Sequence, residues 1–276
     1  MRQAPIRPYL SVFRARFLLM LQYRAAALAG FGTQCWWGFI RVMVLVAFFH
    51  SSSRHQPLSL AQAITYTWLG QAFLALLPWN CDPDVAEMVK TGNVSYERLR
   101  PLDTYFYWYC RAVAFMTART LPRAMLMFFF ATIILPLVGM GSWRLRLPDS
   151  IDAAALFLVA MVCVVLLASA FIMVVNIVVV ETISDRGVNA FAAPMVVAFS
   201  GSLVPLPFFP DWMQLILFLQ PFAGLVDIPY RIYFGNLSGD RALAGLLQQV
   251  AWIGILVLAG HILMTRVMSR LQVQGG

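Results

Sequence analysis

Residues 153–180 read AAALFLVAMVCVVLLASAFIMVVNIVVV, a run of 28 residues without a charged side chain. The hydrocarbon core of a bilayer is about 30 Å thick, and a helix needs roughly 20 apolar residues to cross it. Inside lipid, backbone N–H and C=O groups must be paired within their own segment, so such a run forms a helix. This stretch therefore predicts a membrane-spanning helix.

Five further apolar stretches are long enough to cross a bilayer. The six predicted spans are 28–49, 58–79, 121–141, 153–179, 188–209 and 245–265. Hydrophobic residues make up 61% of the 276 residues and charged residues only 12%, against about 25% charged residues in soluble domains. We expect an all-α membrane protein with six transmembrane helices, forming a single domain over residues 1–276.

The distribution of positive charge predicts the orientation. Of the 20 Lys and Arg residues, 14 fall on the side of the N-terminus and five on the other, while Arg41 lies within the first span. Cytoplasmic loops are enriched in these residues, so both termini are expected in the cytoplasm. The net charge of +8 then reflects topology and contact with anionic lipids, not nucleic-acid binding. The scattered Cys and His residues indicate neither a disulfide framework nor a metal site.

Three segments outside the spans have distinct patterns. Residues 8–24 combine apolar residues at helical spacing with arginines, which favours an interfacial helix; an early start of the first span is the alternative. Residues 80–120 form a charged cytoplasmic connection, and its part 103–120 is expected along the inner membrane interface. Residues 205–240 hold five prolines around a short apolar run, 215–226, which favours a re-entrant or interfacial helix pair.

A short helix is predicted in the charged connection. Asp82 can cap it, Pro83 suits its first position, and Asp84 favours the positive end of the helix dipole. The helix is expected to end at Thr91, before Gly92. It is too short and too charged to cross a membrane.

The chain has one lysine, Lys90, and no glycine-rich turn leads into it. A P-loop needs such a turn to wrap the phosphate oxygens. The chain is therefore not expected to be an enzyme, and any ATP hydrolysis would belong to another polypeptide.

Arg41 and Asp227 are the charges to examine near the outer end of the spans. A pair between them would tie the outer region to the first span; the alternative, which we favour, is that Arg41 extends to the outer interface. Neither a relay of buried carboxylates nor an inverted repeat is evident. A stand-alone secondary transporter or channel is therefore the alternative function, with a membrane enzyme behind it.

Three motifs occur in order along the chain. They are TGNVSYERLRPL at 91–102, FPDW at 209–212 with QPF at 220–222 and Pro229, and RLQVQGG at 270–276. Together with the topology, this set resembles the ABC-2-type permeases, and within them a bacterial subgroup of exporters that combines two permeases with an ATPase. Gln220 departs from the leucine of that subgroup.

The resemblance implies a half-transporter of the bacterial inner membrane. Its partners would be a second permease, paralogous or identical, and two copies of an ABC ATPase that holds ATP and Mg, with no cofactor in this chain. The short helix would be the coupling helix, with Glu87 and Lys90 as polar contacts, Met88 as an apolar contact, and Arg98 and Arg100 in supporting ion pairs. The implied coupling residues are Pro83, Asp84, Glu87, Met88, Lys90, Thr91, Gly92, Arg98 and Arg100.

The proline-broken outer region would form an exit-side lid. The implied lid residues are Pro205, Phe208, Phe209, Pro210, Trp212 and Pro221. Two alternatives remain open: the short helix rests on the membrane without a partner, and the outer aromatic residues form an ordinary interfacial belt.

Overall fold

The computed structural model describes residues 6–22, 24–51 and 56–270, and within these ranges it is helical with no β-strand. The side chain of Arg98, residues 52–55 of the first outer loop and residues 271–276 of the tail motif lie outside the described part. The α-helices, in chain order, are α1 (Ile6–Leu21), α2 (Arg24–Ser51), α3 (Leu60–Ala72), α4 (Pro83–Lys90), α5 (Thr104–Phe129), α6 (Leu135–Leu137), α7 (Ile151–Thr182), α8 (Asp185–Phe199), α9 (Asp211–Leu219), α10 (Asp227–Tyr233) and α11 (Gly239–Arg270).

Four stretches of the described chain are long and apolar enough to cross a membrane. They are Ala27–Ser51, Thr104–Leu137, Ile151–Thr182 and Gly239–Arg270. The chain is therefore an all-helical, multi-pass membrane protein.

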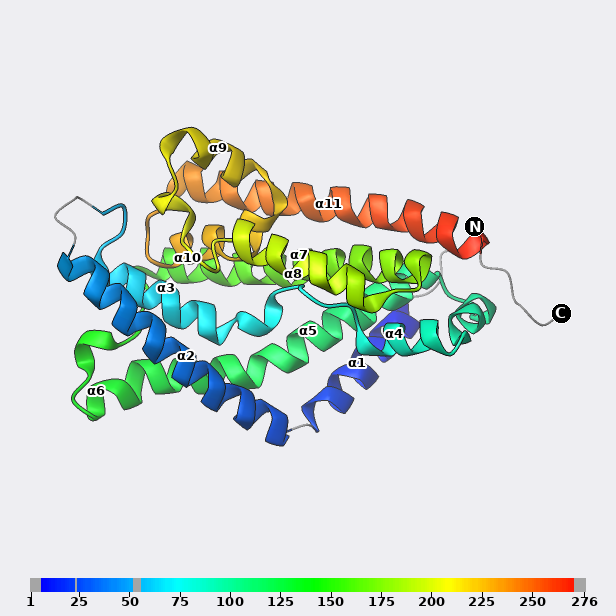
Figure 1. Ribbon diagram of the computed structural model, residues 1–276, viewed down its shortest axis with the longest axis horizontal. Helices are drawn as coiled ribbons and strands as arrows, with labels where there is room; N and C mark the ends of the chain where they lie inside the picture. Colours follow the sequence, from blue (N-terminus) through cyan, green and yellow to red (C-terminus); the bar gives the residue numbers. More distant parts are fainter. Residues whose placement is uncertain (1–5, 23, 52–55, 271–276) are drawn as a thin grey trace.

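The uncharged run of residues 153–180 forms most of α7, which packs against both α5 and α11 (Figure 1). Leu167, Ile172 and Met173 of α7 are buried in this contact region. α1 lies along the first part of α5. α4, the start of α1 and the end of α11 lie at one end of the molecule, and α6, α9 and α10 lie at the other (Figure 1). These are called the α4 end and the α9 end below.

The predicted span 58–79 is not one continuous helix. α3 is about 20 Å long, and a 3-10 turn at Leu74–Leu76 follows it. Side chains of other helices bind carbonyl groups near this break: Tyr230 Oη donates to Leu69 O at 3.0 Å, and Arg119 Nε donates to Ala75 O at 3.1 Å. Non-helical backbone is tolerated at membrane depth where protein groups pair with it in this way.

The segment 103–120 is the first part of α5 rather than a separate interfacial segment. The side chain of Asp103 caps α5 by accepting from Phe106 N at 2.9 Å. α5 continues past Pro122 to Phe129, and a π-helical turn, Phe130–Ile134, joins it to α6. A proline removes one helical hydrogen bond, and here packing against α1 and α7 outweighs that loss.

The predicted span 188–209 ends early, because α8 stops at Phe199. Gly201, at φ +87°, then turns the chain, and several prolines prevent the helix from resuming. The apolar run 215–226 is divided after Gln220, between α9 and a 3-10 turn at Pro221–Leu225. α10 follows and is almost entirely buried.

Candidate functional site

α4 is a short helix whose ends are set by its own sequence. The Asp82 side chain caps it by accepting from Asp84 N at 3.0 Å, and Pro83 occupies the first turn. Thr91 is the C-cap, and Gly92, at φ +73°, lets the chain turn away. The bounds Pro83–Lys90 are close to those predicted from the capping residues.

The Asp84 carboxylate joins α4 to two other helices. Arg16 Nη1 of α1 lies 2.6 Å from Asp84 Oδ2, and Arg111 Nη2 of α5 lies 2.7 Å from the same oxygen. The two arginine side chains are 12% and 13% exposed. Charge-assisted hydrogen bonds of this length are strong, so one carboxylate holds α1, α4 and α5 together. Arg16, Asp84 and Arg111 are called the Asp84 cluster below.

Two asparagine side chains bind the backbone that leads into α4. Asn176 Oδ1 of α7 accepts from Asp82 N at 2.9 Å, and Asn189 Oδ1 of α8 accepts from Cys81 N at 2.9 Å. The Asp82 carboxyl group is buried; desolvation raises its pKa, and the charge of Arg111 partly opposes that rise. The start of α4 is therefore fixed to α7 and α8.

The other face of α4 is open. Pro83, Glu87 and Thr91 are exposed. Tyr96 and Leu99, on the 3-10 turn Asn93–Leu99 that packs on α4, are 65% and 79% exposed. Large apolar side chains beside exposed polar groups are typical of a surface that binds another protein. Pro83, Glu87, Thr91, Tyr96 and Leu99 are called the α4 surface below.

Two other implied coupling residues, Met88 and Lys90, contact the rest of the chain. Met88 is half-buried against an apolar cluster that includes Trp108 and Ile177. Lys90 Nζ lies 3.0 Å from Asp185 Oδ2 at the start of α8. This hydrogen bond raises the pKa of Lys90 and lowers the pKa of Asp185.

Glu97 joins the turn after α4 to α5. Its carboxylate pairs with Arg100 at 3.1 Å and accepts from Trp108 Nε1 at 3.1 Å. The Arg100 guanidinium also lies 4.7 Å from the centre of the Tyr107 ring. Arg100 therefore supports this turn within the chain, while the side chain of Arg98 lies outside the description.

At the α9 end, three consecutive carbonyl groups after α8 are each bound by a different helix. Asp227 N of α10 donates to Ser200 O at 3.2 Å, and Tyr66 Oη of α3 donates to Gly201 O at 3.0 Å. Arg41 Nη1 of α2 donates to Ser202 O at 3.0 Å. Residues 200–202 with these three donors are called the outer network below.

The structure gives Arg41 and Asp227 different partners. Asp227 is 1% exposed; its carboxylate lies 3.3 Å from Arg231 Nη1 and accepts from Leu206 N at 3.1 Å. Arg41 instead binds the backbone of Ser202. The two residues are thus connected through the chain that leaves α8, not by an ion pair with each other.

We expect Gly201→Ala to destabilise the protein. An added Cβ would lie 2.6 Å from Tyr66 Oη, and φ at this position is +87°. Left-handed backbone costs about 1–2 kcal/mol for a residue with a side chain, and displacement of Tyr66 would also weaken its bond to Gly201 O. The melting temperature in detergent should fall. Gly235→Ala is the matched control, because Gly235 has a similar φ of +75° and no atom within 4 Å of the added Cβ; an equal loss in both variants would rule out the clash with Tyr66.

The implied lid residues lie at the α9 end, on or next to α9. Trp212 is 72% exposed, whereas Phe208 is half-buried with its ring 6.5 Å from that of Phe48. Pro205 precedes a 3-10 turn, Pro210 precedes α9, and Pro221 opens the turn after it.

Side chains of α11 donate hydrogen bonds to the backbone at the end of α9. Gln248 Nε2 donates to the carbonyls of Phe218 and Gln220 at 3.2 and 2.8 Å, and Trp252 Nε1 donates to Leu219 O at 2.8 Å. Gln220 Nε2 also donates to Phe199 O at 2.9 Å, and its Oε1 accepts from Phe222 N at 2.7 Å. Gln220 therefore links the end of α8 to the break after α9, which a leucine could not do.

Sequence reasoning missed several residues that position the site. Arg16 and Arg111 enter the sequence argument only as charges that set the topology or lie at the membrane interface, and Tyr66 does not enter it at all. Asn176 does carry a signal, because it is an amide within the uncharged run 153–180. Within the described ranges, no group of three or more His, Cys, Asp or Glu residues could hold a metal ion.

Comparison with known proteins identifies the family of this chain. A family model described as ABC-2 family transporter protein matches residues 35–275. Neither the curated proteins nor the solved structures include a match. The matched range covers most of the chain, including α4 and the outer network, and the chain therefore belongs to the ABC-2 family of transporter proteins.

Proposed function

We propose that this chain is the permease subunit of an ATP-driven exporter and that α4 is its coupling helix. The α4 surface carries this proposal, because it combines an exposed charge on a helix fixed to the bundle with exposed apolar side chains on the turn that packs against that helix. ABC-2 family permeases generally work with ABC ATPase subunits. ATP and Mg would be bound by that partner, and cargo would cross between this chain and a second permease, paralogous or identical.

Six passes through the bacterial inner membrane fit the path of the chain. α3 and α8 are shorter than a hydrocarbon core, at about 20 and 22 Å, yet each carries the chain part of the way between the α9 end and the α4 end. The non-helical segments that follow them complete these passes. With the α4 end in the cytoplasm, the positive charge is distributed as the positive-inside rule requires.

The contacts of α4 support a path for motion. The Asp84 cluster joins α4 to α1 and α5, and Lys90 joins it to α8. A nucleotide-driven change in the ATPase can shift the permease only if its contact with α4 differs between the two states. The outer network and α9 would then respond at the exit side.

We expect Glu87→Arg to weaken binding of the ATPase about tenfold, because reversing an exposed contact charge costs roughly 1–2 kcal/mol. The measurement is the amount of ATPase that co-purifies with the tagged permease in detergent, at about one ATPase per permease in the wild type. Membrane insertion and the elution volume of the permease should not change. Asp240→Arg, an exposed carboxylate at the start of α11 near the α9 end, is the control.

Co-purification equal to wild type in Glu87→Arg would reject α4 as the coupling helix. A wild-type chain that transports in proteoliposomes without an ATPase would instead establish a stand-alone transporter.

A further inference from the structure

A cavity of about 540 Å³ lies where α1, α2 and α5 meet. Its wall is mostly apolar, and Leu21, Leu28, Phe115 and Leu126 contribute to it. The volume lies in the range of about 300–1,000 Å³ typical of ligand sites. Because α2 and α5 hold membrane-spanning stretches, the surrounding lipid is the first source of an apolar occupant.

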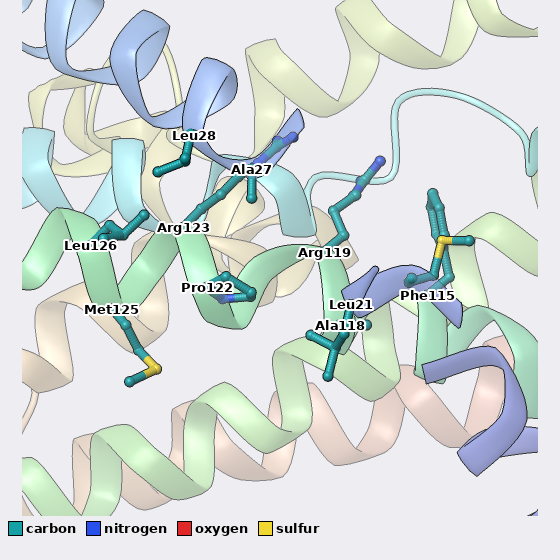
Figure 2. A pocket seen from close by; sticks show the side chains of 11 residues that line it. Leu21, Ala27, Leu28, Phe115, Ala118, Arg119, Pro122, Arg123, Met125 and Leu126 are labelled. Carbon is teal, nitrogen blue, oxygen red and sulfur yellow. The ribbon is translucent and has the colours of Figure 1, made fainter. Parts of the chain in front are cut away.

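Two arginines of α5, Arg119 and Arg123, also line this cavity, and none of its lining residues is acidic. Figure 2 shows both side chains extending from the same side of α5, while Met125 points to the opposite side. Like charges four residues apart on a helix repel each other. An anion between them would relieve this repulsion, and arginine binds phosphate oxygens in a bidentate manner.

The neighbours of the arginines limit where they can move. Arg119 Nε donates to Ala75 O at 3.1 Å, and its guanidinium lies 4.7 Å from the centre of the Phe115 ring. The guanidinium of Arg123 lies against α2, since a Cβ added at Gly30 would be 2.7 Å from its Cζ. Both charges are thus held at the cavity by α2, α5 and the segment after α3.

We propose that this cavity binds one anionic phospholipid of the surrounding membrane, with its phosphate at Arg119 and Arg123 and an acyl chain along the apolar wall. Basic pockets between transmembrane helices bind anionic headgroups in this manner. The occupant would contact α1, α2 and α5 together, and would stabilise the angle between α1 and α2. The inference rests on the membrane-spanning assignment and not on coupling to an ATPase.

The test is native mass spectrometry of the full chain in detergent, with phosphatidylglycerol and phosphatidylcholine added in equal amounts. An arginine near an anionic headgroup contributes about fivefold in affinity, so the wild type should prefer phosphatidylglycerol by at least about fivefold. Arg123→Gln should reduce this preference about fivefold. Leu28→Trp, which fills the apolar wall and keeps both arginines, should reduce binding of both lipids.

Arg266→Gln is the matched control, because Arg266 is exposed near the end of α11 and does not line the cavity. It should keep the wild-type preference. The proposal would be overturned by equal binding of the two lipids to the wild type, by a wild-type preference in Arg123→Gln, or by wild-type binding of both lipids to Leu28→Trp. A photoactivatable phosphatidylglycerol that gives no crosslink to α1, α2 or α5 would also overturn it.

Discussion

Asp227→Ala is expected to lower the free energy of unfolding by about 3 kcal/mol, which would be the largest loss from any single change considered for this chain. The Asp227 carboxylate is 1% exposed and pairs with Arg231, and it also accepts from Leu206 N. Its removal leaves the partly exposed Arg231 guanidinium and the buried Leu206 N–H without their acceptor, which costs more than the pair itself contributes.

The melting temperature in detergent measures this effect. Asp227→Asn retains an acceptor oxygen for Leu206 N but not the charge, so its melting temperature should lie between those of wild type and Asp227→Ala. Asp211→Ala is the matched control, since Asp211 is exposed at the start of α9, and it should melt close to the wild type. If Asp227→Ala and Asp211→Ala melt alike, the contacts of the Asp227 carboxylate with Arg231 and Leu206 N do not stabilise the fold.

The second large effect is expected from Asp84→Ala. This change leaves Arg16 and Arg111 without the carboxylate that they share, at side-chain exposures of 12% and 13%. Because Asp84 itself is 43% exposed, the loss should be about 2 kcal/mol, below that of a fully buried pair. Loosening of α4 from α1 and α5 should also reduce transport driven by the ATPase.

The control for Asp84→Ala is Asp185→Ala, which removes the partner of Lys90 on the exposed side of the same helix. An exposed pair contributes little to stability, so this variant should melt near the wild type. Two measurements are needed: the melting temperature of the permease, and ATPase activity stimulated by the reconstituted permease. Should Asp185→Ala lose as much stability as Asp84→Ala, the Asp84 cluster would not be the main attachment of α4.

Much of the fold could be predicted from hydropathy and capping. The uncharged run 153–180 forms most of α7, and the Asp-Pro-Asp sequence at 82–84 starts α4 where its capping chemistry requires. Hydropathy alone could not reveal the breaks in α3 and α8, because these depend on distant partners such as Tyr230 for Leu69 O. α5 continues through Pro122 because it packs against other helices. This packing also involves distant parts of the chain, so a single sequence does not show it.

The site could be predicted only in part. Local sequence identified α4 and its exposed Glu87. The capping residue Asp82, the charge of Glu87 and the helix-ending Gly92 can all be recognised from neighbouring residues alone. It could not show that Asp84 and Met88 face the bundle, because that depends on how α4 sits on α5 and α7. The resemblance named Arg98 and Arg100 for ion pairs; Arg100 pairs with Glu97 of the same turn, and the role of Arg98 remains a prediction.

α8 has a consequence for how the two ends of the molecule communicate. The first half of α8 is bonded to α4 through Asp185 and to the segment before α4 through Asn189. The end of α8 leads directly into the outer network. Among the described residues of α8, Val196 is the one that is buried. A helix can carry coupling along its axis, and few buried side chains hold this one along its flanks. α8 would then transmit an axial displacement of α4 to Ser200, Gly201 and Ser202 at the start of the outer network.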